Sequence, residues 1–214
     1  MKRTIDIESW NRKEHYSLFR TLDDPFFGVT VNIDFSNVYK LAKQNNASFF
    51  LYSLYKIMQA VNSVEEFRYR IEDESVVCYD VIHPTSTIGR ADGTFSFSFF
   101  EYNHDLDIFV GNGTEAIAKV KSTSGIGVTP DTDRADVIHY SPVPFIQFTD
   151  MKHAMSFGNN RGIPKISTGK YFNYEHKIML PVSITVNHAL MDGLHVAKFI
   201  DELQSFIYSC EIEN

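Results

Sequence analysis

The C-terminal third of the chain holds a strand pattern that runs directly into a helix pattern, and this pair constrains the fold more than any other feature. Residues 180–188 alternate between apolar and polar side chains, which is the period of a strand with one face against a core. After Asp192-Gly193, apolar residues recur at helical spacing from Val196 to Ile207, and this spacing predicts an amphipathic helix. A sheet with a helix packed against it is therefore expected.

Strand and helix patterns also occur through the rest of the chain. The expected strands cover residues 27–33, 67–71, 75–79, 94–100 and 144–148, and the expected helices lie around 38–42, 51–61 and 107–122. Residues 123–134 are rich in Gly, Ser, Thr and Asp, which predicts a loop. The pattern as a whole is typical of an α+β domain whose mixed or antiparallel sheet is covered by helices.

Charge and composition argue against several classes of protein. The net charge is −7, from 20 Lys and Arg against 27 Asp and Glu, so no overall basic character favours non-specific nucleic-acid binding. No apolar run approaches the length of a membrane span, and the first residues lack the apolar segment of a signal peptide. Cys78 and Cys210 have no metal-binding spacing, so free thiols are expected. We expect a soluble, cytoplasmic protein that binds neither nucleic acid nor membrane.

His188 stands where the alternating strand stops and the turn into the helix begins. A strand end fixes a side chain while the turn leaves it open to a ligand, and an imidazole can take a proton from a hydroxyl near neutral pH. From the residues alone, a structural or surface histidine remains the alternative, and Asp192 has the alternative role of capping the helix. His195 is expected to pack or to cap. No third ligand lies at metal-binding spacing, so no metal is expected.

The segment from His188 to Phe199 resembles the H-A-V-C-D-G-F-H-V-A-R-F segment of the chloramphenicol acetyltransferases. The segment from Trp10 to Tyr16 is similar to their W-x-R-R-E-H-F segment. Further similar segments follow in the family's order, at about its spacing: Gln59-Ala60-Val61-Asn62, Thr94-Phe95-Ser96, Gly127-Val128-Thr129-Pro130, Gly169-Lys170-Tyr171 and Leu180-Pro181-Val182. The resemblance implies a single domain over residues 1–214. Its implied fold is an α/β (α+β) two-layer sandwich of the CoA-dependent acyltransferase type, with a mixed, largely antiparallel sheet covered by helices.

Carried over residue by residue, the resemblance implies a site for acetyl transfer. His188 is expected to be the general base that takes the proton of an acceptor hydroxyl as it attacks the thioester of acetyl-CoA. Ser141 is expected to donate a hydrogen bond to the oxyanion that forms, and Ser167 to hold a water near it where the family has a threonine. Without the family, Ser141 before Pro142 is typical of a turn.

The resemblance also implies residues that support this site. Arg12 and Asp192 are expected to form a buried ion pair that holds the catalytic turn, and Tyr171 is expected to pack against the coenzyme. Without the family, Arg12 is typical of a solvated charge at a helix start, and Tyr171 of a core or surface aromatic residue. Acetyl-CoA is the implied co-substrate, and no permanently bound cofactor is expected.

Several positions depart from the family's pattern. Asn187 stands where the family usually has a histidine, and its side chain is expected on the opposite face of the strand. In the expected acceptor pocket, Phe19 replaces a tyrosine, Lys165 and His153 replace apolar residues, and Met151 replaces another pocket residue. A lysine in such a pocket either extends to solvent or indicates a more polar or anionic acceptor. The catalytic residues are thus retained, while the positions that contact the acceptor differ.

We therefore expect an acetyl-CoA-dependent O-acetyltransferase that acts through a ternary complex. Its expected acceptor is chloramphenicol or a related small molecule with a hydroxyl, which implies a role in antibiotic resistance. Two alternatives stay open: an acyltransferase for a different, more polar hydroxyl acceptor, and a catalytically silent relative that binds a ligand. The resemblance further implies a homotrimer whose active sites lie between subunits, with His188 facing a pocket lined partly by the neighbouring subunit.

Overall fold

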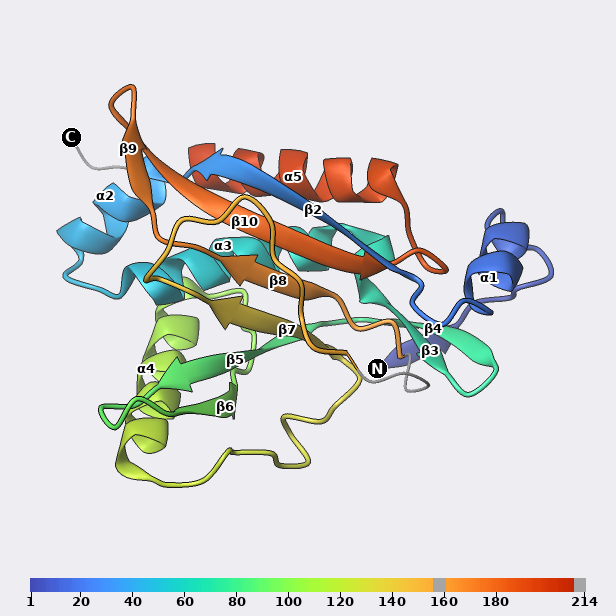
Figure 1. Ribbon diagram of the computed structural model, residues 1–214, viewed down its shortest axis with the longest axis horizontal. Helices are drawn as coiled ribbons and strands as arrows, with labels where there is room; N and C mark the ends of the chain where they lie inside the picture. The colour runs from blue at the N-terminus through green and yellow to red at the C-terminus, as the bar shows by residue number, and fades with distance from the viewer. Residues whose placement is uncertain (156–160, 210–214) are drawn as a thin grey trace.

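A seven-stranded sheet forms the centre of the computed structural model, which describes residues 1–155 and 161–209 (Figure 1). Its strands lie in the order β2 (Phe26–Asp34), β10 (Lys177–Asn187), β8 (Lys165–Thr168), β7 (Val137–Pro142), β5 (His83–Gly89) and β6 (Phe95–Phe99), with β9 (Phe172–Tyr174) paired to β10. The pairs β5–β7 and β7–β8 are parallel, and the other pairs are antiparallel. The predicted mixed, largely antiparallel sheet is confirmed.

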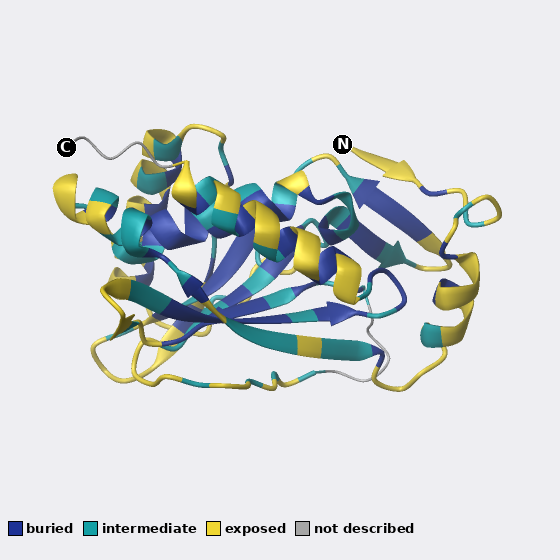
Figure 2. Ribbon diagram, turned by 90° about the horizontal axis from the view of Figure 1, so that it is seen from above, coloured by how far each residue is buried: buried dark blue, intermediate teal, exposed yellow. Residues whose placement is uncertain are grey.

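Helices α3 (Phe49–Ser63) and α5 (Gly193–Tyr208) lie on one side of this sheet (Figure 2). α3 packs against α5, against α4 (Leu106–Ser122) and against α2 (Ser36–Gln44), while α1 (Lys13–Phe19) lies at one end of the molecule (Figure 1). α3 buries residues on nearly all its faces, because it is covered by helices and by the sheet. The core lies between the helices and the sheet, which agrees with the predicted two-layer arrangement.

A second, three-stranded sheet of β1 (Lys2–Thr4), β4 (Ser75–Tyr79) and β3 (Tyr69–Glu72) is joined to the main sheet through a buried arginine. The guanidinium of Arg70 donates hydrogen bonds to the carbonyl oxygens of Phe67, Tyr69, Ala135 and Val137. These bonds satisfy the buried cation with backbone oxygens and fix the start of β7 against the smaller sheet.

Strand alternation gives the centre of the main sheet two unlike faces. Ser141 of β7 lies in register with Ser167 of β8, which lies in register with Ser183 of β10. The intervening residues Tyr140 and Ile166 belong to the core beneath the helices. We call the opposite side the polar face, and it is formed by His139, Ser141, Lys165, Ser167, Ser183 and Thr185.

Most of the elements predicted from the sequence are confirmed. The strands at 27–33, 94–100 and 180–188, the helices around 38–42, 51–61 and 107–122, the C-terminal helix and the loop at 123–134 are all present. The hairpin of 67–71 and 75–79 also forms, although residues 67 and 68 belong to a 3-10 turn, η1 (Glu65–Arg68). Cys78 is buried and free, as expected, while Cys210 lies outside the described residues.

The strand expected at residues 144–148 is wrong. The strand of this region is β7, which ends at Pro142, and the next segment has no strand partner in the described structure. Pro144, the first residue of the expected strand, lacks the backbone N–H that a central strand needs. The side chain of Phe145 is 82% exposed, so the apolar pattern here does not record burial. One consequence is that Ser141 lies in a strand and not in the turn that its local sequence indicates.

Candidate functional site

The ring of His188 stands just beyond the last residue of β10, and two phenylalanines pack against it. Its backbone N–H donates to the oxygen of Pro25 at 2.8 Å. The ring stacks on Phe19, with centroids 4.0 Å apart and an interplanar angle of 7°, and its centroid lies 4.7 Å from that of Phe27. Nδ1 of His188 is buried and has no hydrogen-bond partner among the described residues. The ring plane is therefore set by packing.

A buried arginine clamps the His188 turn, residues 188–192. Arg12 Nη1 donates to Asp192 Oδ2 at 2.6 Å, and Arg12 Nη2 donates to the backbone oxygen of His188 at 3.1 Å. The side chain of Arg12 is 8% exposed, and that of Asp192 is 33% exposed. Burial raises the pKa of Asp192, but the hydrogen bond from Arg12 and nearby positive charge outweigh it and hold the pKa below its usual range.

The same turn is closed on its other side by a capping box at the start of α5. The carboxylate of Asp192 accepts from the backbone N–H of Leu194 at 3.0 Å, and Nδ1 of His195 accepts from the backbone N–H of Asp192 at 3.0 Å. Nε2 of His195 lies 3.3 Å from Glu66 Oε1. The predicted capping roles of Asp192 and His195 are confirmed. Asn187 is fully buried, and its Oδ1 accepts from the backbone N–H of Ala189 at 2.8 Å.

The polar face brings together a second group of candidate residues. Ser141 and Ser167 are register partners on parallel strands, so their side chains lie side by side on this face. Ser167 Oγ lies 3.1 Å from Nε2 of His153, and Nζ of Lys165 lies 3.4 Å from Nδ1 of His139. Sequence reasoning missed His139. His139 and Ser141 are two residues apart, which is the spacing of side chains on one face of a strand, but the sequence analysis did not predict that strand.

Burial changes the titration of the three basic groups on this face. It lowers the pKa of His139 to about 4, with help from the charge of Lys165. It lowers the pKa of His153 for the same two reasons, and it lowers the pKa of Lys165. Both histidines are therefore neutral at pH 7, and each can accept a hydrogen bond.

A hollow of about 480 Å³ opens over the polar face and is lined by Ser141, His153, Lys165 and His139, together with Phe95 and Phe97 of β6. We call it the polar-face hollow. An adjoining hollow of about 230 Å³ shares His139, Lys165 and Asp133 with it. Of the residues expected in the acceptor pocket, Phe19 stacks on the ring of His188, and Met151 lines neither hollow.

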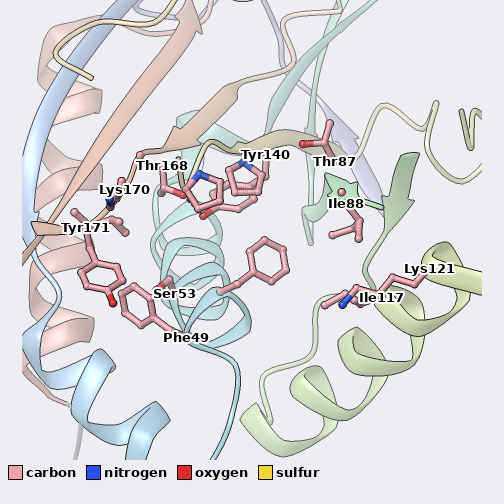
Figure 3. Close-up of a pocket in the computed structure, with 16 residues that line it drawn as sticks. Phe49, Ser53, Thr87, Ile88, Ile117, Lys121, Tyr140, Thr168, Lys170 and Tyr171 are labelled. Atoms are coloured by element: carbon pink, nitrogen blue, oxygen red, sulfur yellow. Dashed lines mark hydrogen bonds between the residues drawn. The ribbon is translucent and has the colours of Figure 1, made fainter. Parts of the chain in front are cut away.

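A further pocket of about 360 Å³ lies toward the helix side of the sheet (Figure 3). The rings of Tyr171 and Phe49 lie on one side of it and Lys121 of α4 on the other, with Lys170 beside Tyr171 (Figure 3). The centroids of the Tyr171 and Phe49 rings are 5.8 Å apart, and Tyr171 is 40% exposed. This pocket and the polar-face hollow share two residues, Thr87 and Tyr140.

The shared residues mark the place where two strands separate. The register of β5 with β7 ends at Ser86 and Tyr140, although both strands continue beyond these residues. The sheet therefore opens between β5 and β7. The pocket on the helix side, called the helix-side pocket below, and the polar-face hollow are both lined by residues at this opening.

The His188 turn and the serine pair are far apart within one chain. Ser167 lies in register with Ser183 on β10, and His188 follows Ser183 by five residues. At ~3.3 Å per residue this separation along β10 is about 16 Å. Figure 1 shows β10 extending past β8 toward the turn. The structure therefore does not bring His188 and Ser141 together in a single subunit.

Comparison with known proteins identifies the family of the chain. The family model described as chloramphenicol acetyltransferase matches residues 2–204. The chain belongs to the chloramphenicol acetyltransferase family. The expected family is thereby confirmed, and membership places the chain among acyltransferase enzymes.

Individual relatives support the same family and fold. A chloramphenicol acetyltransferase of Proteus mirabilis is 30% identical over 203 residues, which cover 94% of this chain and 93% of that protein. A solved chloramphenicol acetyltransferase superposes with a TM-score of 0.90 at 30% identity, covering 97% of this chain and 100% of the other. A probable dihydrolipoamide acetyltransferase of Listeria monocytogenes shares the fold, with a TM-score of 0.68 at 12% identity over 94% of this chain and 92% of the other. The predicted acyltransferase fold is confirmed.

No helix within residues 1–155 and 161–209 combines the length and apolar character needed to cross a membrane. In the same residues, no group of three His, Cys, Asp or Glu side chains is arranged to hold a metal ion.

Proposed function

We propose that this chain is an acetyl-CoA-dependent O-acetyltransferase that works as one catalytic domain and uses His188 as its general base. The observation that carries the proposal is the double clamp of Arg12 on the His188 turn, through Asp192 and through the backbone oxygen of His188 itself. A buried cation that fixes a loop around an imidazole is a means of holding a reactive group in place. A protein that only bound a ligand would have no need for it.

The proposed reaction is a direct transfer. The acceptor hydroxyl oxygen attacks the carbonyl carbon of the acetyl thioester while His188 removes the hydroxyl proton. The Ser141 hydroxyl donates to the oxyanion of the tetrahedral intermediate, and Ser167 beside it holds a water at the same oxygen. The carbon–sulfur bond then breaks, and CoA leaves as a thiol with the proton returned by His188.

We propose that acetyl-CoA occupies the helix-side pocket and reaches the polar face between β5 and β7. Tyr171 offers an aromatic surface to the coenzyme, and Lys170 and Lys121 supply positive charge for its phosphates. The thioester end would meet Thr87 and Tyr140, which line both this pocket and the polar-face hollow. The acceptor would enter the polar-face hollow from the other side.

We propose that the working unit is a homotrimer in the cytoplasm, with each site formed between two subunits. The separation of about 16 Å along β10 supports this arrangement, because a base must come within hydrogen-bond reach of the proton it takes. In a cyclic assembly, His188 of one subunit can face Ser141 and Ser167 of the next. Each subunit then contributes one His188 turn and one polar-face hollow.

The proposed acceptor is chloramphenicol or a related small alcohol, and its acetylation would give antibiotic resistance. The names of the relatives at 30% identity support this choice. A more polar acceptor is the second candidate, and it is favoured by the presence of Lys165 and two histidines in the hollow.

The test is release of free CoA thiol from acetyl-CoA in the presence of chloramphenicol and a panel of small alcohols. His188→Ala is expected to lower kcat by about 10²–10⁴ because general base catalysis is lost. His104→Ala, an exposed histidine before α4, is the matched control and should leave kcat unchanged. A wild-type protein that binds acetyl-CoA but turns over no acceptor would instead support a silent binding protein.

His153 is the rival base because it lines the polar-face hollow and its Nε2 lies 3.1 Å from Ser167 Oγ. His153→Leu distinguishes the two assignments, since leucine fills a similar volume but takes no proton. Our proposal expects kcat within a few-fold of wild type in that variant. A loss as large as that of His188→Ala would transfer the role of base to His153.

A further inference from the structure

Lys165 is a cation of the polar-face hollow that the proposed acetyl transfer does not use. It lies two residues before Ser167 in β8, on the same face, and it lines both the hollow and its smaller neighbour. Its Nζ lies 3.4 Å from Nδ1 of His139. Within the part of the chain that the structure describes, no carboxylate lies at ion-pair distance from this ammonium.

The other titratable groups around the hollow leave the charge of Lys165 unbalanced. Nη1 of Arg161 lies 3.5 Å from Oδ1 of Asp133 and donates to the backbone oxygen of Asp133 at 2.7 Å, so these two charges offset each other. Burial lowers the pKa of His139 to about 4 and also lowers the pKa of His153, so both are neutral at pH 7. The net charge of these groups around the two hollows is therefore that of one lysine.

An ammonium held in a half-buried hollow with one neutral neighbour is costly. Its pKa is lowered by burial, which shows that the surroundings disfavour the charged form. An uncharged, apolar acceptor would remove water from this group without replacing it. An anionic oxygen on the acceptor would supply the missing partner through a charge-assisted hydrogen bond.

We infer that the acceptor carries an anionic oxygen group, such as a carboxylate or a phosphate, and that Lys165 binds it. This inference rests on the proposed function, because it places the acceptor in the polar-face hollow beside Ser141. It selects the second candidate, the more polar acceptor, over chloramphenicol, which carries no anionic group. Phe95 and Phe97 give the hollow an apolar wall. The acceptor class is thus a small hydroxy acid with an aromatic or aliphatic body, with its hydroxyl at Ser141 and its anion at Lys165.

The test uses three alcohols that share one framework. 4-(Hydroxymethyl)benzoate carries the anion, its methyl ester removes the charge, and 4-nitrobenzyl alcohol replaces the carboxylate with an uncharged group of the same planar shape. Binding of each to the full-length protein in the presence of CoA is measured by titration calorimetry, and turnover is measured by thiol release. We expect the benzoate to bind about tenfold or more tightly than either neutral alcohol, as one charge-assisted hydrogen bond allows.

Lys165→Met keeps the length of the side chain and removes its charge. It should lower the affinity for the benzoate about tenfold or more while changing the affinity for the two neutral alcohols less than threefold. Lys165→Arg should keep the preference for the anion. Lys152→Met, an exposed lysine in the nearby loop, is the matched control and should change neither affinity.

Two results would overturn the inference: equal affinity of the wild-type protein for the benzoate and its ester, or an unchanged benzoate affinity in Lys165→Met. The first comparison needs no variant, so it holds even if a substitution prevents folding. Thiol release separates this inference from the proposed function. Turnover of neutral alcohols without any preference for the anion would contradict the inference but not the proposed function. Tight, Lys165-dependent binding of the benzoate without turnover of any alcohol would contradict the proposed function but not the role of Lys165 in binding an anion.

Discussion

The His188 turn and the polar-face hollow are built in opposite ways. The turn consists of consecutive residues, closed by a capping box and clamped by Arg12. The hollow takes its residues from β5, β6, β7 and β8 and from two loops, and its polar groups meet through single contacts such as that of Lys165 with His139. A turn that several hydrogen bonds hold in one conformation suits a chemical step that is the same for every acceptor. A surface assembled from many segments can change its lining without disturbing that step.

Among substitutions in the hollow, Ser141→Ala is expected to lower kcat the most. Loss of one donor to a developing oxyanion lowers kcat by about 10²–10³, and the KM for acetyl-CoA should change little because Ser141 lines the polar-face hollow and not the helix-side pocket. Steady-state thiol release measures both constants. Ser183→Ala, a buried serine on the same face that lines neither hollow, is the control. Equal losses of kcat in Ser141→Ala and Ser183→Ala would show that Ser141 has no special role in the reaction.

In the turn, the largest expected effect is on stability. Arg12→Ala leaves the carboxylate of Asp192 without its partner and should reduce the free energy of unfolding by about 2 kcal/mol, less than for a fully buried pair because a third of Asp192 is exposed. Arg20→Ala removes an exposed pair with Glu74 from the same helix region and should cost less than about 1 kcal/mol. Urea titration at pH 7 measures the free energy of unfolding of both variants. Wild-type stability in Arg12→Ala would show that the clamp is unimportant.

The same clamp predicts a dependence on pH. The pKa of Asp192 is lowered in the folded state, so its contribution is fully present above the pKa of about 3.9 of an unfolded aspartate and is lost as the pH falls through the lower folded value. The stability difference between wild type and Asp192→Asn should therefore be constant from pH 7 to about pH 5 and should shrink below about pH 4. Urea titrations across this range measure it. A difference that grew on acidification would contradict the direction of the shift.

The smallest of these effects is expected at the coenzyme pocket. Tyr171→Ala should raise the KM for acetyl-CoA by about fivefold, with little change in kcat, because an aromatic contact is worth about 1 kcal/mol. Tyr174→Ala, a more exposed tyrosine of the same region that does not line the pocket, is the control. A change in kcat and none in KM would place the coenzyme elsewhere.

The two regions also differ in how far the sequence predicts them. The His188 turn was predicted because its strand, its turn and its helix are contiguous, and the period of each pattern is visible in the sequence. Arg12 is distant in sequence, and its expected contact with Asp192 came from family resemblance and not from local pattern. The structure places the two atoms 2.6 Å apart.

The hollow was predicted less well, for a physical reason. Its residues meet through the register of β7 with β8 and of β5 with β7, and register between parallel strands depends on contacts that no local pattern records. The fully buried Ile138 and Ile166 alternate with polar residues in both strands, but β8 is short and β7 ends in a proline. His139 was missed in this way.

The central claim is that each active site combines the His188 turn of one subunit with the hollow of another. The direct test is to unfold His188→Ala and Ser141→Ala together, refold them as a mixture and measure thiol release. Random assembly gives about a quarter of the sites both intact groups, so activity should recover to about a quarter of wild type, while the two variants refolded separately and then mixed should stay near their own residual rates. Activity of the co-refolded mixture no greater than the average of the two variants would contradict a shared site.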